Sequence, residues 1–152
     1  MGHEFVELQN TAAAIDAYRR AVDINSCDYR AWYGLGQAYE MMMMPLYALH
    51  YFRKSVFLQP NDPRLWIAMA HCYESNQLNM LEEAIKCYKR AANQQDTEAI
   101  AVNRLAKLHD QIGNQSEAAF YYTKDLERMG SEEREGPKMV DALLFLDRYY
   151  GR

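Results

Sequence analysis

The chain of 152 residues carries 17 lysines and arginines against 21 aspartates and glutamates, so its formal net charge is −4. This balance, with a pI near 5.6 and no run of basic residues, argues against a surface built to bind nucleic acid. The longest nearly apolar stretch, residues 41–49, is shorter than the about 20 residues that a membrane-spanning helix needs, and no apolar signal segment opens the chain. We therefore expect a protein that binds neither nucleic acid nor a membrane.

Glycine and proline are scarce, with 7 and 4 residues, which favours long helices over many short strands. The three cysteines, Cys27, Cys72 and Cys87, form no paired framework, and this indicates a reducing, intracellular compartment.

In chain order, apolar periodicity and turn residues predict a succession of helices. Residues 1–8 are interpreted as the second half of a helix, Asp28, Asp62 and Ser116 as N-terminal caps, and Gly113 as a helix stop. The further predicted helices are 11–24, 28–41, 45–58, 63–75, 80–92, 97–112, 116–129 and 138–150.

A repeated pattern accounts for these helices. Residues Trp32, Leu35, Gly36, Tyr39, Ala48, Phe52 and Pro60 match the tetratricopeptide (TPR) consensus W-x2-L-G-x2-Y, A-x3-F, P, whose period is 34 residues. The same residue types recur at that spacing on either side, with a slip of two residues near Asn76; the recurring positions are Ala14, Tyr18, Trp66, Met69, Ala70, Tyr73, Ala84, Tyr88, Ala118 and Tyr122. Small residues then lie where helices approach closely, and aromatic residues fill the gaps.

The predicted fold is therefore all-α: a right-handed TPR superhelix of antiparallel helix pairs. The expected organisation is a TPR array over 1–129, a charged loop at 130–137 and the start of a further, truncated repeat at 138–152. Within the array we expect a partial repeat at 1–27 and repeats at about 28–61, 62–96 and 97–129. Because both ends fall inside a repeat, the pattern suggests a fragment or part of a larger assembly.

No catalytic or metal-binding motif is visible. Histidines and cysteines lack the spacings of a zinc site, and neither phosphate-binding glycine motif occurs. A catalytic Ser-His-Asp triad formed by residues distant in the sequence is an alternative, but a solenoid offers no obvious cleft for it. We expect no enzyme, no metal and no cofactor, with Cys72 and Cys87 as buried packing thiols.

The methionines at 41–44 lie at a predicted turn before Pro45. They could form an adaptable binding surface, but a turn packed under the next repeat is the favoured interpretation.

The groove formed by the first helix of each repeat is the predicted partner-binding surface. Arg30 and Arg64 lie near the start of two such helices, and three columns follow them: Tyr33, Ile67 and Asn103; Gln37, His71 and Lys107; and Glu40, Glu74 and Asp110. The acidic column suits a peptide that carries arginine, because a guanidinium pairs bidentately with a carboxylate. A merely solvated face is the alternative.

A more specific resemblance is carried by AIDAYRRAVDIN (14–25), DYRAWYGLGQAYE (28–40), YALHYFRKS (47–55), QPNDPRLWIAMAHCYE (59–74) and RLAKLHDQIG (104–113). These phrases resemble the cell division cycle protein 23 family, TPR subunits of the anaphase-promoting complex, in its C-terminal TPR region.

The resemblance implies a non-catalytic scaffold in a multisubunit ubiquitin ligase of mitosis, nuclear and cytoplasmic in location. It implies other subunits of the complex as partners, activator proteins that bring an arginine-containing motif to the groove, and a homodimer in the full-length protein only. Another TPR adaptor, such as a co-chaperone that clamps a chaperone's C-terminal carboxylate, is the alternative. The acidic column makes this co-chaperone alternative the less favoured one, because carboxylates in the groove repel the carboxylate of a partner.

Overall fold

The computed structural model describes residues 2–94, 100–131 and 137–151, and the side chains of 9–94, 100–127 and 140–151. Over this part of the chain the backbone forms α-helices and no strand, which confirms the all-α prediction. The helices are α1 (Gly2–Ile24), α2 (Tyr29–Met41), α3 (Pro45–Leu58), α4 (Pro63–Glu74), α5 (Leu81–Ala92), α6 (Ile100–Gln111), α7 (Gln115–Ser131) and α8 (Pro137–Tyr150). None of the helices in the described ranges is both long and apolar enough to cross a bilayer.

The chain forms two compact units, Met1–Cys87 and Tyr88–Arg152, and the boundary between them falls inside α5. The first unit contains α1 to α4 and the start of α5. The second contains the end of α5 together with α6, α7 and α8. Each unit has buried apolar residues of its own.

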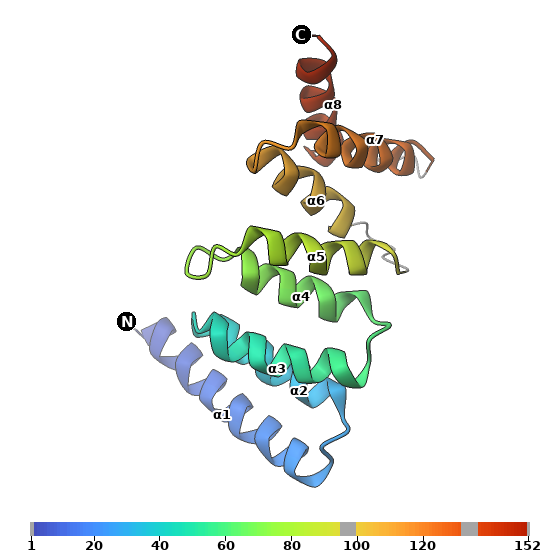
Figure 1. The fold of residues 1–152 in the computed structure, drawn as a ribbon. Coiled ribbons are helices and arrows are strands. Elements are labelled where there is room, and N and C mark those ends of the chain that lie inside the picture. The colour runs from blue at the N-terminus through green and yellow to red at the C-terminus, as the bar shows by residue number, and fades with distance from the viewer. Residues whose placement is uncertain (1, 95–99, 132–136, 152) are drawn as a thin grey trace. The chain divides into compact units, whose positions relative to one another are not determined.

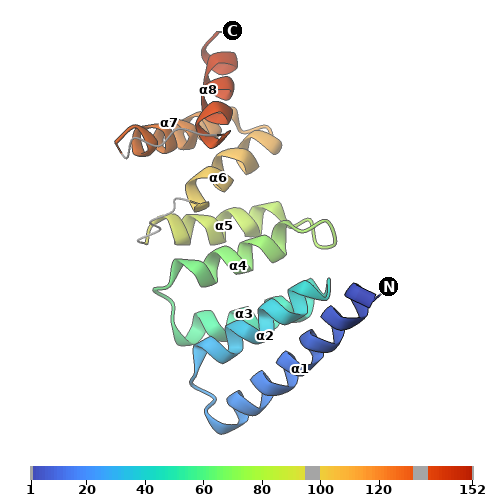
Figure 2. The same ribbon diagram turned by 180° about the vertical axis from the view of Figure 1, so that it is seen from behind.

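In the first unit, consecutive helices run antiparallel and lie side by side, as both views show (Figures 1 and 2). The core includes residues that the repeat pattern specifies, of which Leu35, Ala48, Phe52 and Ala70 have 0% of their surface exposed, and Leu65, outside the pattern, has 1%. Burial of such a side chain contributes about 1.5–3 kcal/mol, so the fixed spacing of these residues is what holds α2, α3 and α4 together.

Two glycines of α2 lie where another helix approaches closely. A Cβ atom on Gly36 would stand 2.4 Å from the ring of Phe52, and one on Gly34 would stand 2.4 Å from the ring of Tyr18. The sequence predicted a close approach at Gly36 and did not single out Gly34.

The turns that precede α2 and α4 are built alike. Asp28 and Asp62 each accept a backbone hydrogen bond from the residue two positions later, at 3.1 and 3.0 Å, which confirms both as N-caps. The indole nitrogens of Trp32 and Trp66 each donate 2.9 Å hydrogen bonds, to the backbone oxygens of Ser26 and Pro60. The two turns thus repeat the same cap and the same tryptophan hydrogen bond at a spacing of 34 residues.

Three predicted boundaries need correction. The turn expected between residues 8 and 11 is absent, because no glycine or proline interrupts that stretch and α1 continues through it. Ser116 does not cap α7, which already begins at Gln115. α7 continues through Gly130 and Ser131, and Pro137 begins α8, whereas residues 132–136 of the predicted charged loop lie outside the described residues.

The methionine turn fits the favoured interpretation in part. Met41 and Met43 are each 72% exposed, whereas Met42 and Met44 are partly buried and the Met43 carbonyl oxygen accepts a 3.1 Å hydrogen bond from Gln77 Nε2 in the next repeat. Met43 has a φ of 62°, in the left-handed region that normally favours glycine.

In the second unit, α7 packs against both α6 and α8 (Figure 1). The core contains three alanines with 0% exposure, Ala106, Ala118 and Ala142, and two aromatic rings, Tyr122 and Phe145, whose centroids are 4.6 Å apart. Small residues again let the helices approach while rings fill the space between them.

Candidate peptide-binding surface

The predicted groove residues of the first unit lie along one face of α2 and one face of α4, at the spacing of three and four residues that aligns side chains on a helix. On α2 they are Arg30, Tyr33, Gln37 and Glu40, and on α4 they are Arg64, Ile67, His71 and Glu74. Five of the eight are exposed; Tyr33 and Glu74 are partly buried, and Ile67 is buried with 8% exposure.

A direct contact joins the two faces at their acidic end. The Cys72 Sγ atom on α4 donates to the Glu40 Oε2 atom on α2 at 3.5 Å. Burial, and then the charge of Glu40, raise the pKa of the Cys72 thiol well above its usual range. Burial also raises the pKa of Cys87, to about 11. Both thiols are therefore protonated and poorly nucleophilic at neutral pH, as expected of packing cysteines.

Tyr33 lies midway along this surface. Its ring is half-buried, with its centroid 5.6 Å from that of Phe52. Burial raises the pKa of the Tyr33 hydroxyl, while Arg64 lowers it and Glu40 raises it. The hydroxyl is thus within electrostatic reach of a cation on α4 and an anion on α2. We call the surface formed by the eight predicted groove residues of α2 and α4 the A-helix face.

The other end of the A-helix face is basic, but its charges have internal partners. Arg64 binds Asp62 through two side-chain hydrogen bonds of 3.1 and 2.8 Å, which lowers the pKa of Asp62. The Arg30 guanidinium lies 5.8 Å from the centre of the Tyr29 ring. The A-helix face is therefore polarised, with a partly neutralised basic end and the Glu40 carboxylate at the other end.

In the second unit, two of the three predicted groove residues of α6, Asn103 and Lys107, make internal polar contacts. Asn103 is 3% exposed and donates from Nδ2 to Asp125 Oδ2 at 3.2 Å, while Lys107 Nζ lies 3.6 Å from Asp141 Oδ2 on α8. Asp110 lines a small cavity of about 100 Å³ together with residues of α7 and α8. Asp125, only 1% exposed, is a buried carboxylate that sequence reasoning missed, because its neighbours give it no apolar or motif context.

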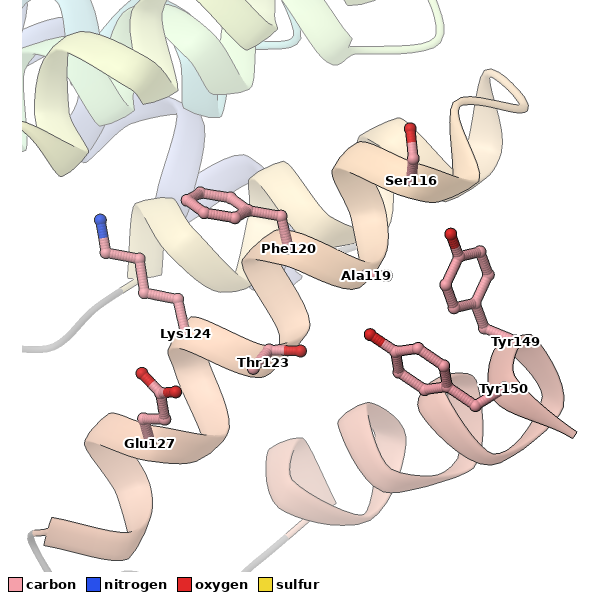
Figure 3. Close-up of a pocket in the computed structure, with 8 residues that line it drawn as sticks. All are labelled: Ser116, Ala119, Phe120, Thr123, Lys124, Glu127, Tyr149 and Tyr150. Atoms are coloured by element: carbon pink, nitrogen blue, oxygen red, sulfur yellow. The ribbon is translucent and has the colours of Figure 1, made fainter.

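A larger pocket, of about 490 Å³, lies between α7 and α8 (Figure 3). Tyr149 and Tyr150 project from α8 toward α7, which contributes Phe120, Lys124 and Glu127. The sequence analysis missed this pocket as well; the adjacent tyrosines at the end of α8 are the signal that could have found it. Because the lining holds both a lysine and a glutamate, it favours neither charge in a ligand.

Among the described residues, no group of three or more His, Cys, Asp or Glu side chains is placed to hold a metal ion.

Comparison with known families identifies the repeat. Residues 2–42 match the family described as "TPR repeat", and residues 63–96 match the family described as "Tetratricopeptide repeat". These matches confirm the TPR prediction.

Curated relatives share the sequence more closely over part of its length. The chain is similar to anaphase-promoting complex subunit 8 of Arabidopsis thaliana, with 71% identity over 77 residues, and of Dictyostelium discoideum, with 53% identity over 73 residues. A third similarity, 41% over 54 residues, is to protein bimA of Emericella nidulans. The matched segments cover 51%, 48% and 36% of this chain but only 13%, 12% and 7% of the relatives.

Solved structures support the fold alone. The chain is similar to MamA from Desulfovibrio magneticus RS-1, with a TM-score of 0.72 and 19% identity, over 88% of this chain and 75% of that one. A MamA RS-1 double mutant gives a TM-score of 0.73 over 89% of this chain and 75% of that chain.

Proposed function

We propose that this chain, a run of tetratricopeptide repeats similar to anaphase-promoting complex subunit 8, is a scaffold segment of an anaphase-promoting complex in the nucleus and cytoplasm. It binds neighbouring subunits, and its A-helix face receives an arginine-containing segment of an activator protein. The segment is a binding element and not an enzyme. High identity to two subunits of that name supports the scaffold role.

The single observation that carries the arginine preference is the environment of Glu40. Its side chain is exposed, and one carboxylate oxygen accepts only a weak thiol hydrogen bond, from Cys72. Within the described residues it makes no ion pair, so a guanidinium from a partner can approach it. Two helical turns before Glu40 on the same face, the half-buried ring of Tyr33 offers a flat surface for a neighbouring side chain of the arginine-containing segment.

The carboxylate-clamp alternative has less support. A clamp needs cations that are available to a C-terminal carboxylate, but Arg64 is already held by Asp62, and Lys107 lies 3.6 Å from Asp141.

Binding of a fluorescent peptide with one central arginine and apolar neighbours tests the proposal by anisotropy. Glu40→Lys should weaken binding about fivefold or more, since an exposed ion pair contributes up to about 1 kcal/mol and reversal adds repulsion. Glu82→Lys is the matched control, because Glu82 is also exposed and its reversal changes the net charge equally. Equal effects of the two variants, or no binding by the folded wild-type chain, would exclude the A-helix face as the arginine site.

A further inference from the structure

The first unit contains a pocket that shares no lining residue with the A-helix face. It has a volume of about 410 Å³ and is formed by the turn before α2, the start of α2 and the second half of α3. Its lining residues are Ser26, Trp32, His50, Arg53, Lys54, Phe57 and Leu58. We call it the α3 pocket.

The α3 pocket is basic without a compensating carboxylate. Helix α3 contains no aspartate or glutamate, although the chain as a whole is acidic. Lys54 Nζ lies over the Trp32 ring, 4.6 Å from its centre, and Arg53 donates to the neutral hydroxyl of Tyr73. In the part of the chain that the structure describes, neither these two cations nor His50 forms an ion pair.

Basic residues on two other helices behave differently. Arg20, one repeat before Lys54, is 2.7 Å from Asp16 on α1, and Lys86 is 3.2 Å from Glu83 on α5. These exposed cations are neutralised within their own helix, and those of α3 are not. The α3 pocket therefore keeps two cations without a carboxylate partner.

Apolar surface adjoins these charges. The Phe57 side chain is 86% exposed, and the Trp32 ring, held by its hydrogen bond to the Ser26 backbone oxygen, is covered by Lys54 and stacks on Tyr51. The exposed Phe57 ring beside these charges provides an anchor point for an apolar side chain. The pocket between α7 and α8, with Lys124 beside Glu127, has no comparable charge preference.

We propose that the α3 pocket docks an acidic peptide segment of a partner protein. Carboxylates of the segment pair with Lys54 and Arg53, the His50 ring offers a hydrogen-bond donor beside them, and an adjacent apolar side chain of the segment covers Phe57. The charge complementarity is the argument for this occupant: two cations, Arg53 and Lys54, with no internal counter-ion fit carboxylates and repel a basic segment. This inference does not depend on the proposed activator site, whose charge preference is the opposite.

The test uses a fluorescent peptide of alternating aspartates and glutamates around one central phenylalanine, and a control peptide in which asparagine and glutamine replace the acids. Anisotropy should show binding of the acidic peptide that weakens with added salt, and little binding of the amide peptide. An arginine-bearing peptide bound to the A-helix face should not displace it.

Variants locate the binding site. Lys54→Gln should weaken the acidic peptide about fivefold, whereas Lys86→Gln, the same change at an exposed lysine already paired with Glu83, should not. Phe57→Ser should also weaken binding of the acidic peptide. Because the Phe57 side chain is 86% exposed, this change should leave the fold intact. Equal effects of the two lysine variants, salt-insensitive binding, or no binding of the acidic peptide at about 1 mM would overturn the proposal.

Discussion

The guanidinium of Arg53 on α3 donates a 2.7 Å hydrogen bond to the hydroxyl of Tyr73 on α4. One repeat earlier, Arg19 on α1 donates to the hydroxyl of Tyr39 on α2 at 2.6 Å. The same pair therefore links α1 to α2 and α3 to α4, in each case the second helix of one repeat to the first helix of the next. It is a polar bridge at the edge of an otherwise apolar contact.

We expect Tyr73→Phe to lower the free energy of unfolding by about 1 kcal/mol, because it removes a hydrogen bond to a charged group that is partly exposed. Urea unfolding measures the change. Tyr47→Phe is the control, since the Tyr47 side chain is 56% exposed. Equal midpoints for the two variants would show that the Arg53 bridge contributes nothing.

Alanine at the two close-approach glycines should give different results. Gly36→Ala forces a methyl group against the ring of Phe52, which is 0% exposed and has no room to move, so we expect a loss of about 1–3 kcal/mol. Gly34→Ala meets the ring of Tyr18, which is 37% exposed and can rotate outward. The gain in helix propensity, about 1 kcal/mol, then offsets the displacement. Thermal unfolding of both variants tests this, and a more damaging Gly34→Ala would contradict it.

Met43→Gly should stabilise the chain by about 0.5–1 kcal/mol, because a φ of 62° costs an ordinary residue energy that glycine does not lose. Met41→Gly, which places glycine in the last residue of α2, should destabilise instead. Chemical denaturation distinguishes the two, and a destabilised Met43→Gly variant would indicate that the methionine side chain has a packing role.

His109 should make stability depend on pH. Its ring is 4% exposed, stacks on Tyr121 at 5.6 Å, and among the described residues neither ring nitrogen has a hydrogen-bond partner. Burial, and then the charge of Lys89, lower the pKa of His109, while Glu117 opposes them. Below about pH 6.5 the unfolded chain gains a proton that the folded chain resists, so the free energy of unfolding falls with falling pH.

His109→Phe keeps an aromatic ring in place and removes the titration. The decrease in unfolding free energy between neutral pH and about pH 5.5 should then be smaller than in the wild type. Unfolding curves at both pH values measure it. An unchanged pH dependence would show that other groups dominate.

The sequence predicted the repeat because its signal lies in large and small residues at fixed spacing. The consensus specifies the residues that pack between helices, and the core residues Leu35, Ala48 and Phe52 all match it. It did not predict contacts that depend on how neighbouring helices are rotated. The contact of Cys72 with Glu40 and the burial of Asn103 against Asp125 are of this kind, since no local pattern specifies which polar side chains meet across helices. The left-handed backbone at Met43 was not predicted either, because methionine is not a residue type that favours a positive φ.

The two tryptophan hydrogen bonds, from Trp32 to Ser26 and from Trp66 to Pro60, give the chain a pair of built-in reporters. Each indole N–H must break its hydrogen bond before it exchanges with deuterium, and the two signals are followed separately by NMR. In a repeat array, stability is roughly a sum of local terms and neighbour contacts. Exchange of the two protons at different denaturant concentrations would therefore show the repeats of the first unit opening one after the other, and simultaneous exchange would show them opening together.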